Sequence, residues 1–221
     1  AQETEDLQQR VTELEKELEE LREKIPRIGY INRQDAFSVF PGAVEEERGE
    51  VGRLEQELEQ LTASFREGEI DRSEYGRQSD LLRAKHLQAK INADLSLLNQ
   101  MIEAKGFTDI SDRLKSLKDQ TKPMQDTISS LIEDIEDSSV SPQKVSSTLN
   151  QVDSQQFKQL DSILTNLAQA KISQVARIIA EEEGYDLIVE MQNVVLYRQE
   201  SLVNDITPRV KQRLEDELQQ E

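Results

Sequence analysis

Apolar residues recur at alternating spacings of four and three along several stretches of this chain. Glu and Lys fill most positions between them, as in VTELEKELEELREKI near the start. A strict repeat of 3.5 residues is typical of a coiled-coil seam, whereas the face of a globular helix follows a period of 3.6. The clearest repeats are Leu7, Val11, Leu14, Leu18, Leu21, Ile25 and Ile110, Leu114, Leu117, Thr121, Met124, Ile128, Leu131, Ile135. The sequence therefore predicts long helices that pack along narrow apolar stripes.

The composition agrees with narrow stripes rather than with a conventional globular core. Hydrophobic residues make up 35% of the chain, aromatic residues 4% and charged residues 33%. Ordinary domains are roughly half apolar and a quarter charged. A coiled-coil seam needs only about two apolar residues in seven, so a chain this polar can still be ordered. Disorder is the competing interpretation, and the periodicity favours extended helices.

Prolines, glycines and capping residues divide the first half of the chain. Pro26 is expected to end the first helix. The stretch 68–75 indicates a bend or a helix restart, with Ser73 as the N-cap. A third helix, with Leu87, Ile91, Leu95, Leu98 and Ile102 on its apolar face, is expected to end at Gly106. Thr108 or Ser111 is expected to cap the helix that follows.

The second half is divided in the same way. We expect a kink or a restart near Lys122, because Pro123 lies inside a helical pattern. Residues 138–142 form a clear break, with Ser141 as N-cap and Pro142 at the first helical position. The last long helix, with Leu149, Val152, Leu160, Ile163, Leu167 and Ala170 on its face, should run to about Glu183 and end at Gly184. A final helix is expected to begin with Thr207 as its cap.

Segments rich in β-forming residues lie near both ends, with only helical patterns between them. The first covers residues 28–32, and the other two cover 186–190 and 193–198, joined by a short turn. The simplest arrangement brings them into one small sheet, which the intervening helices leave and rejoin. Three short strands bury too little surface to be stable alone, so oligomerisation is expected. The predicted fold is thus mostly α with a small β head.

Two blocks of sequence resemble the Skp/OmpH family of periplasmic chaperones for outer-membrane proteins. They are PRIGYINRQDAFSVFPG near the start and VARIIAEEEGYDLIVEMQNVVLYRQESLVNDITPRVKQRL near the end. The resemblance covers residues 27–66 and about 172–214, and the middle matches only as coiled coil. It divides the chain into an N-terminal coiled-coil extension (1–26), a strand head with a C-terminal helix (27–42 and 184–221) and a long helical tentacle (43–183).

The resemblance implies an ATP-independent holdase of the periplasm. We expect the chain to be the mature form that remains after a signal peptide is removed. Its strands would join in a trimeric, barrel-like head, and its tentacles would enclose a cavity for unfolded outer-membrane proteins. No catalytic residue, cofactor or metal is implied. The residues expected to build the head and its subunit contacts are Ile28, Tyr30, Ile31, Leu187, Val189, Val194, Leu196 and Ile206.

The chain departs from the family pattern in three ways. First, the N-terminal heptad is absent from the family pattern. Second, the middle of the chain, about 106–152, lengthens the tentacle, either as a second hairpin or as a longer arm. The tip of the tentacle is expected near Gly68, Gly106 or Ser139. The formal net charge is −18, whereas the family carries a basic surface. Strong acidity argues against binding to nucleic acid and makes contact with an anionic membrane doubtful.

The nearest approach to a basic patch is Arg72, Arg77, Arg83, Lys85 and Lys90, with His86 among them. These residues are candidates for steering a client or a lipid, although acidic residues interleave with them. A solvated helix face is the simpler interpretation.

Enzyme chemistry finds no support in the sequence. The chain has one histidine, His86, and no cysteine, which excludes multi-histidine and cysteine-based sites. No phosphate-binding glycine loop is present, and no apolar run approaches the roughly 18 residues of a membrane span. Beside the holdase, two alternatives stay open: an acidic coiled-coil spacer or scaffold of the cell envelope, and a chaperone adapted to basic clients.

Overall fold

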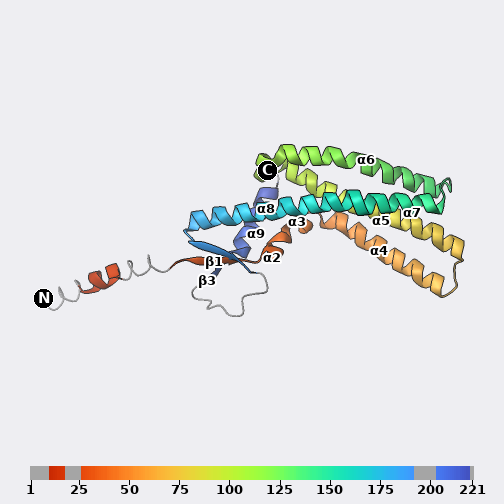
Figure 1. Cartoon of the computed structure of the whole chain (residues 1–221). Coiled ribbons are helices and arrows are strands. Elements are labelled where there is room, and N and C mark those ends of the chain that lie inside the picture. Colours follow the sequence, from red (N-terminus) through yellow and green to blue (C-terminus); the bar gives the residue numbers. More distant parts are fainter. Residues whose placement is uncertain (1–9, 18–25, 192–202, 220–221) are drawn as a thin grey trace.

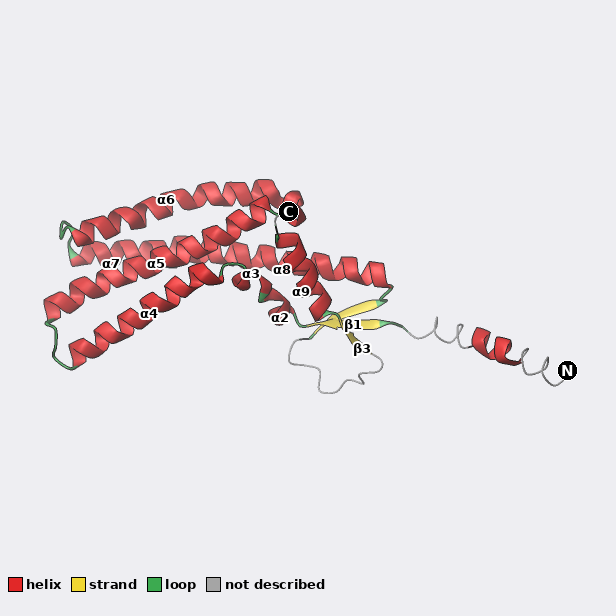
Figure 2. Ribbon diagram, turned by 180° about the vertical axis from the view of Figure 1, so that it is seen from behind, coloured by secondary structure: helices red, strands yellow, loops and turns green. Residues whose placement is uncertain are grey.

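The computed structural model describes residues 10–17, 26–191 and 203–219, and there the chain is mostly helical with one small sheet (Figures 1 and 2). The elements are β1 (Ile28–Ile31), α2 (Arg33–Phe37), α3 (Val39–Gly42), α4 (Glu45–Arg66), α5 (Arg72–Glu103), the 3₁₀ helix η1 (Lys105–Ile110), α6 (Ser111–Glu136), α7 (Pro142–Gln151), the π-helix η2 (Val152–Phe157), α8 (Lys158–Glu183), β2 (Leu187–Glu190), β3 (Val203–Asp205) and α9 (Thr207–Leu218). Residues 10–17 are also helical. The predicted combination of long helices and a small sheet is confirmed.

The three strands are parallel, in the order β2-β1-β3. Ile28 pairs with Leu187 on one side and with Val203 on the other. The prediction that 28–32 and 186–190 share a sheet is confirmed. Parallel strands need a long crossover, and between β1 and β2 that crossover consists of all the helices from α2 to α8. The predicted strand 193–198 lies outside the described residues. Strand β3 was not predicted, because three residues are too few to show an alternation of apolar and polar side chains.

The arm, residues 45–183, consists of two helical hairpins that start and end near the sheet (Figures 1 and 2). Helix α4 leads away from the sheet and α5 returns; α6 leads away again, and α7, η2 and α8 return. Residues 106–152 therefore belong to a second hairpin. Gly68 and Ser138, both with left-handed backbone (φ 78° and 54°), lie in the two distal turns. Gly106 lies at the proximal end, against Glu217 of α9.

The core of the arm lies on the inner faces of α5, α6 and α8. Of the predicted series from Ile110 to Ile135, the seven residues that lie in α6 are buried, and Ile110, at the end of η1, is half-buried. On the predicted face of α5, Ile102 is half-buried against the core and the other four residues are buried: Leu87, Ile91, Leu95 and Leu98. The heptad pattern therefore identified the packing faces of these two helices correctly.

Pro123 does not interrupt α6, which runs unbroken from Ser111 to Glu136. The expected restart near Lys122 is therefore wrong. Pro123 is exposed, whereas Thr121 and Met124 on the neighbouring positions are buried. Proline has no amide hydrogen, so the carbonyl four residues before Pro123 has no donor within the helix, and it lies on the solvent side. The opposite face of α6 packs against α5, and this packing keeps the helix intact.

The last long helix is not uniform, because η2 divides it into α7 and α8. Val152 and Phe157 are five positions apart and both buried, which matches the wider π-helical turn. The added residue changes the phase of α8, so the buried line runs through Leu160, Leu164, Ala168 and Ile172. Ile163 and Leu167 of the predicted stripe are half-buried against the core, and only Ala170 is exposed, so the predicted stripe is correct except at its last residue.

Helix ends were predicted with mixed success. Ser141 caps α7, where its hydroxyl accepts from the Lys144 amide, and Gly184 ends α8 with φ 68°. The cap of α5 is Asp71 rather than Ser73, because the Asp71 carboxylate accepts from the amides of Ser73 (2.7 Å) and Glu74 (2.9 Å). Neither Thr108 nor Ser111 caps α6, since η1 leads directly into it with Ile110 at the cap position.

Thr207 has a different role from the predicted cap. It is the first residue of α9, after Ile206 at the cap position. The Asp205 carboxylate accepts from the Thr207 amide at 2.9 Å, and the Thr207 hydroxyl accepts from the Asn32 amide at 2.9 Å. Thr207 therefore ties the start of α9 to the end of β1 rather than capping its own helix.

Candidate binding surfaces

The outer face of the sheet carries an apolar group that the register places together. Ile28, Tyr30, Leu187 and Val189 lie on the same face, because Ile28 pairs with Leu187 and Tyr30 with Val189. Leu187 is 51% exposed and Val189 43% exposed. Ile28 is half-buried and Tyr30 is buried. This outer face is the one place in the described sheet where large apolar side chains remain open to solvent.

The inner face of the sheet packs against α8, α9 and Tyr185. Ile31 and Ile206 belong to the main core. Gly29 has no room for a side chain, since a Cβ there would lie 2.6 Å from Ile188 Cδ1 and 3.2 Å from Ile206 Cγ2. The eight residues expected in the head thus divide: Ile31 and Ile206 are core residues, four lie on the outer face, and Val194 and Leu196 lie outside the described residues.

Arg27, directly before β1, contacts the C-terminal end of the arm and the turn that follows it. Its amide donates to the Asp186 carboxylate at 2.8 Å, and its guanidinium donates to the Glu183 carbonyl at 2.5 Å. The same guanidinium lies 5.1 Å from the centre of the Tyr185 ring. This contact holds the strand before the arm against the turn after it.

The five basic candidates do not form one patch. Lys85 pairs with Glu136 of α6 at 2.8 Å, and Lys90 lies 4.9 Å from the centre of the Phe157 ring. Arg83 is exposed on α5. His86 contacts Glu55 of α4 at 3.1 Å. Only Arg72 and Arg77 are brought together, on the wall of a cleft between the two distal turns.

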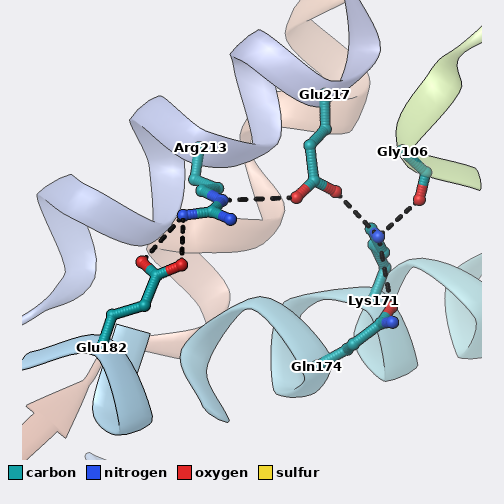
Figure 3. Close-up of polar contacts among 6 residues, drawn as sticks. All are labelled: Gly106, Lys171, Gln174, Glu182, Arg213 and Glu217. Atoms are coloured by element: carbon teal, nitrogen blue, oxygen red, sulfur yellow. Dashed lines mark hydrogen bonds and ion pairs between the residues drawn. The ribbon is translucent and has the colours of Figure 1, made fainter. Parts of the chain in front are cut away.

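A polar network that was not predicted joins the base of the arm to α9 (Figure 3). Lys171 is 6% exposed, and its ammonium contacts Glu217 Oε2 at 2.7 Å, the Gly106 carbonyl at 2.5 Å and Gln174 Oε1 at 3.1 Å. Arg213 extends the network from Glu217 to Glu182 of α8. In the sequence, Lys171 is a charged residue within the apolar line of α8. This interruption is the sequence signal that indicates a buried ion pair.

Asp94 is a second buried charge, inside the arm. It is 7% exposed, and its Oδ2 has no hydrogen-bond partner among the described residues. Burial, and after it the Asp161 carboxylate, raise the pKa of Asp94 to about 6, against the opposing effect of Arg48 and Lys90. A carboxyl in this setting favours its neutral form.

Among the described residues no group of three or more His, Cys, Asp or Glu side chains is arranged to hold a metal ion. In the same part of the chain, no helix is long and apolar enough to cross a membrane. Comparison of the chain with protein-family models, curated proteins and solved structures gave no significant match.

Proposed function

We propose that this chain is an ATP-independent holdase of the periplasm that binds unfolded outer-membrane proteins, as the resemblance to the Skp/OmpH family implies. The observation that carries the proposal is the apolar seam of α4. Leu54 is the one residue of α4 that is buried. Val51, Leu58, Leu61 and Phe65 of the same seam remain half-buried.

A long, shallow apolar seam suits a client without fixed structure. Each half-buried side chain offers part of the roughly 1.5–3 kcal/mol that full burial of a large apolar side chain provides. Several such contacts hold an extended chain without demanding one sequence. A bound client is thereby kept from pairing its strands with those of other molecules, which is the route to aggregation.

The outer face of the sheet supports the oligomeric part of the proposal. Leu187 and Val189 are exposed on an edge strand, and a head of three short strands has little core of its own. In the proposed homotrimer these side chains are buried between subunits, and three arms surround the client. Binding then depends on the combined surface of the arms rather than on a catalytic group.

The test is light-scattering mass after size-exclusion chromatography, with and without an outer-membrane porin diluted from urea. We expect a trimer that gains one porin and keeps it soluble. The double variant Leu58→Glu and Leu61→Glu should keep its oligomeric mass and lose the porin. Gln60→Glu, on an exposed position of the same helix, is the matched control. A wild-type protein that leaves the porin to precipitate contradicts the holdase proposal.

The second candidate is an acidic scaffold or spacer of the cell envelope. The observation that favours it is the N-terminal helical segment, where Val11 and Leu14 of the heptad seam are 54% and 57% exposed. An exposed seam of this kind is suited to a partner helix. A trimer that elutes unchanged while the porin precipitates would favour this function over the holdase.

A further inference from the structure

The two distal turns of the arm together form a cleft of about 330 Å³, which we name the tip cleft. One wall comes from the first turns of α5, and the other from the end of α6 and the start of α7. The lining residues are Arg72, Ser73, Gly76, Arg77, Asp80, Ile135, Ser138, Val140, Pro142 and Val145. The cleft exists only because the chain has a second hairpin beside the first.

The second hairpin supplies an apolar floor. Ile135 and Val145 are buried and Val140 is half-buried. Pro142, at the first position of α7, completes this wall. An apolar floor of this size fits one or two aliphatic side chains of a ligand.

The first hairpin supplies a cationic rim. Arg72 and Arg77 are exposed, and neither guanidinium makes an ion pair with another described residue. Asp80 is the single carboxylate in the lining. The lining is therefore locally cationic on a chain whose formal net charge is −18, and it is complementary to a carboxylate on a ligand.

Gly76 gives the α5 wall its shape. It lies within a helix, where glycine is less stable than alanine. Beyond its chain neighbours and the nearby backbone of its own helix, no heavy atom lies within 4 Å of the place where its Cβ would stand, so the neighbouring packing does not require a glycine here. The missing side chain leaves the cleft open beside the helix and allows an extended chain to approach the backbone closely.

We propose that the tip cleft binds an extended segment of unfolded polypeptide in which apolar and acidic residues alternate. An apolar side chain enters between Ile135, Val140 and Val145, and a neighbouring carboxylate contacts Arg72 and Arg77. This inference rests on the proposed function and adds to it a specific site and a chemistry. It also explains how an acidic protein holds a client segment that carries negative charge.

The test measures fluorescence anisotropy of a labelled peptide with alternating Val and Glu, titrated with the full chain. Gly76→Leu should fill the cleft and weaken binding by about tenfold, the loss expected when one apolar side chain is excluded. Gly76→Ala should weaken binding less than Gly76→Leu does, because it adds only a methyl group to the α5 wall. Gly52→Leu in α4, where the Cβ position is also open, is the matched control. Both leucine variants should fold, since leucine favours helix over glycine.

Charge is tested separately with Arg72→Gln and Arg77→Gln. Each should weaken the Val/Glu peptide by about two- to fivefold at low salt, as expected for an exposed ion pair. A peptide of alternating Val and Lys should bind the wild type more weakly than the Val/Glu peptide does. Equal binding of both peptides, or equal binding by Gly76→Leu and Gly52→Leu, overturns the proposal. Saturable binding of phosphatidylglycerol vesicles that the Val/Glu peptide does not displace, with no peptide binding, also overturns it.

The porin assay distinguishes this inference from the proposed function. If the wild type and Gly76→Leu both hold the porin and neither binds the peptide, the tip cleft is not a client site and the holdase stands. If the peptide binds in the predicted way while the porin precipitates, the cleft stands and the holdase proposal is wrong.

Discussion

The residue with the most constrained surroundings is Lys171, whose charge lies almost fully out of water. The Glu217 carboxylate, the Gly106 carbonyl and the ring of Phe107 surround its ammonium. Gly106 has no room for a side chain, because a Cβ there would lie 2.5 Å from Glu217 Cβ. Lys171 therefore fixes three segments relative to one another: α8, the start of η1 and the C-terminal helix.

Replacing Lys171 with Met should destabilise the fold by about 3 kcal/mol, because the buried Gly106 carbonyl loses its partner and Glu217 keeps only the more distant Arg213. The measurement is urea-induced unfolding followed by circular dichroism. Adding Glu217→Gln should restore part of the lost stability, since the uncompensated charge is then removed. An unfolding midpoint equal to that of the wild type would show that the ion pair does not stabilise the fold.

Asp94 makes stability depend on pH in the direction opposite to that of most carboxylates. Its pKa rises from 3.8 to about 6 on folding. Between these values the folded state binds more protons than the unfolded state, so stability falls as pH rises from about 4 to about 6. Above that window the loss is complete and stays constant.

Asp94→Asn should therefore stabilise the protein at pH 7 by about 2 kcal/mol and should remove this part of the pH dependence. Unfolding midpoints across the window provide the measurement. Asp161→Asn is the control at a neighbouring exposed position, and it should give a smaller gain of the same sign because it removes a like charge. A variant that is less stable than the wild type at pH 7 would contradict the assignment.

At the scale of elements, the sequence predicts helices and their faces well where one period holds throughout. The α6 series was correct because Leu114 to Ile135 keeps one spacing inside one helix. The α8 series was correct only in part, since Ala170 is exposed and the centre of the buried line runs through Leu164 and Ala168. The π-helix η2 inserts a turn of a different width, and no residue type marks a π-helix in advance. Residues that contact partners distant in sequence, such as Lys171 with Glu217, likewise follow from the packing of the hairpins rather than from local pattern.

Pro123 in α6 gives the prediction at this scale. Pro123→Ala should stabilise the protein by about 1–3 kcal/mol, because the helix regains a hydrogen bond on its exposed face. Pro142→Ala is the control, since a proline at the first position of a helix loses no hydrogen bond and should give no such gain. The melting temperatures of both variants test this prediction. A melting temperature below that of the wild type for Pro123→Ala would show that Pro123 does not destabilise α6.

At the scale of the whole molecule, the sheet and the distal turns lie far apart. Strands β1 and β2 lie near the proximal end of the arm, and the turns between α4 and α5 and between α6 and α7 lie at its other end (Figure 1). Assembly through the sheet would leave the distal turns open, which is the geometry a client-holding arm requires.

Leu187→Glu tests whether the outer face of the sheet joins the subunits. Leu187 is 51% exposed in the single chain, so the substitution should leave each subunit folded while placing a charge within the proposed interface. We expect the light-scattering mass to fall from trimer to monomer with unchanged helical circular dichroism. Leu14→Glu, on the exposed N-terminal segment, tests the competing interface. If Leu14→Glu dissociates the oligomer and Leu187→Glu does not, the N-terminal heptad joins the subunits. The sheet would then make contacts only within its own subunit, where it joins the two ends of the helical arm.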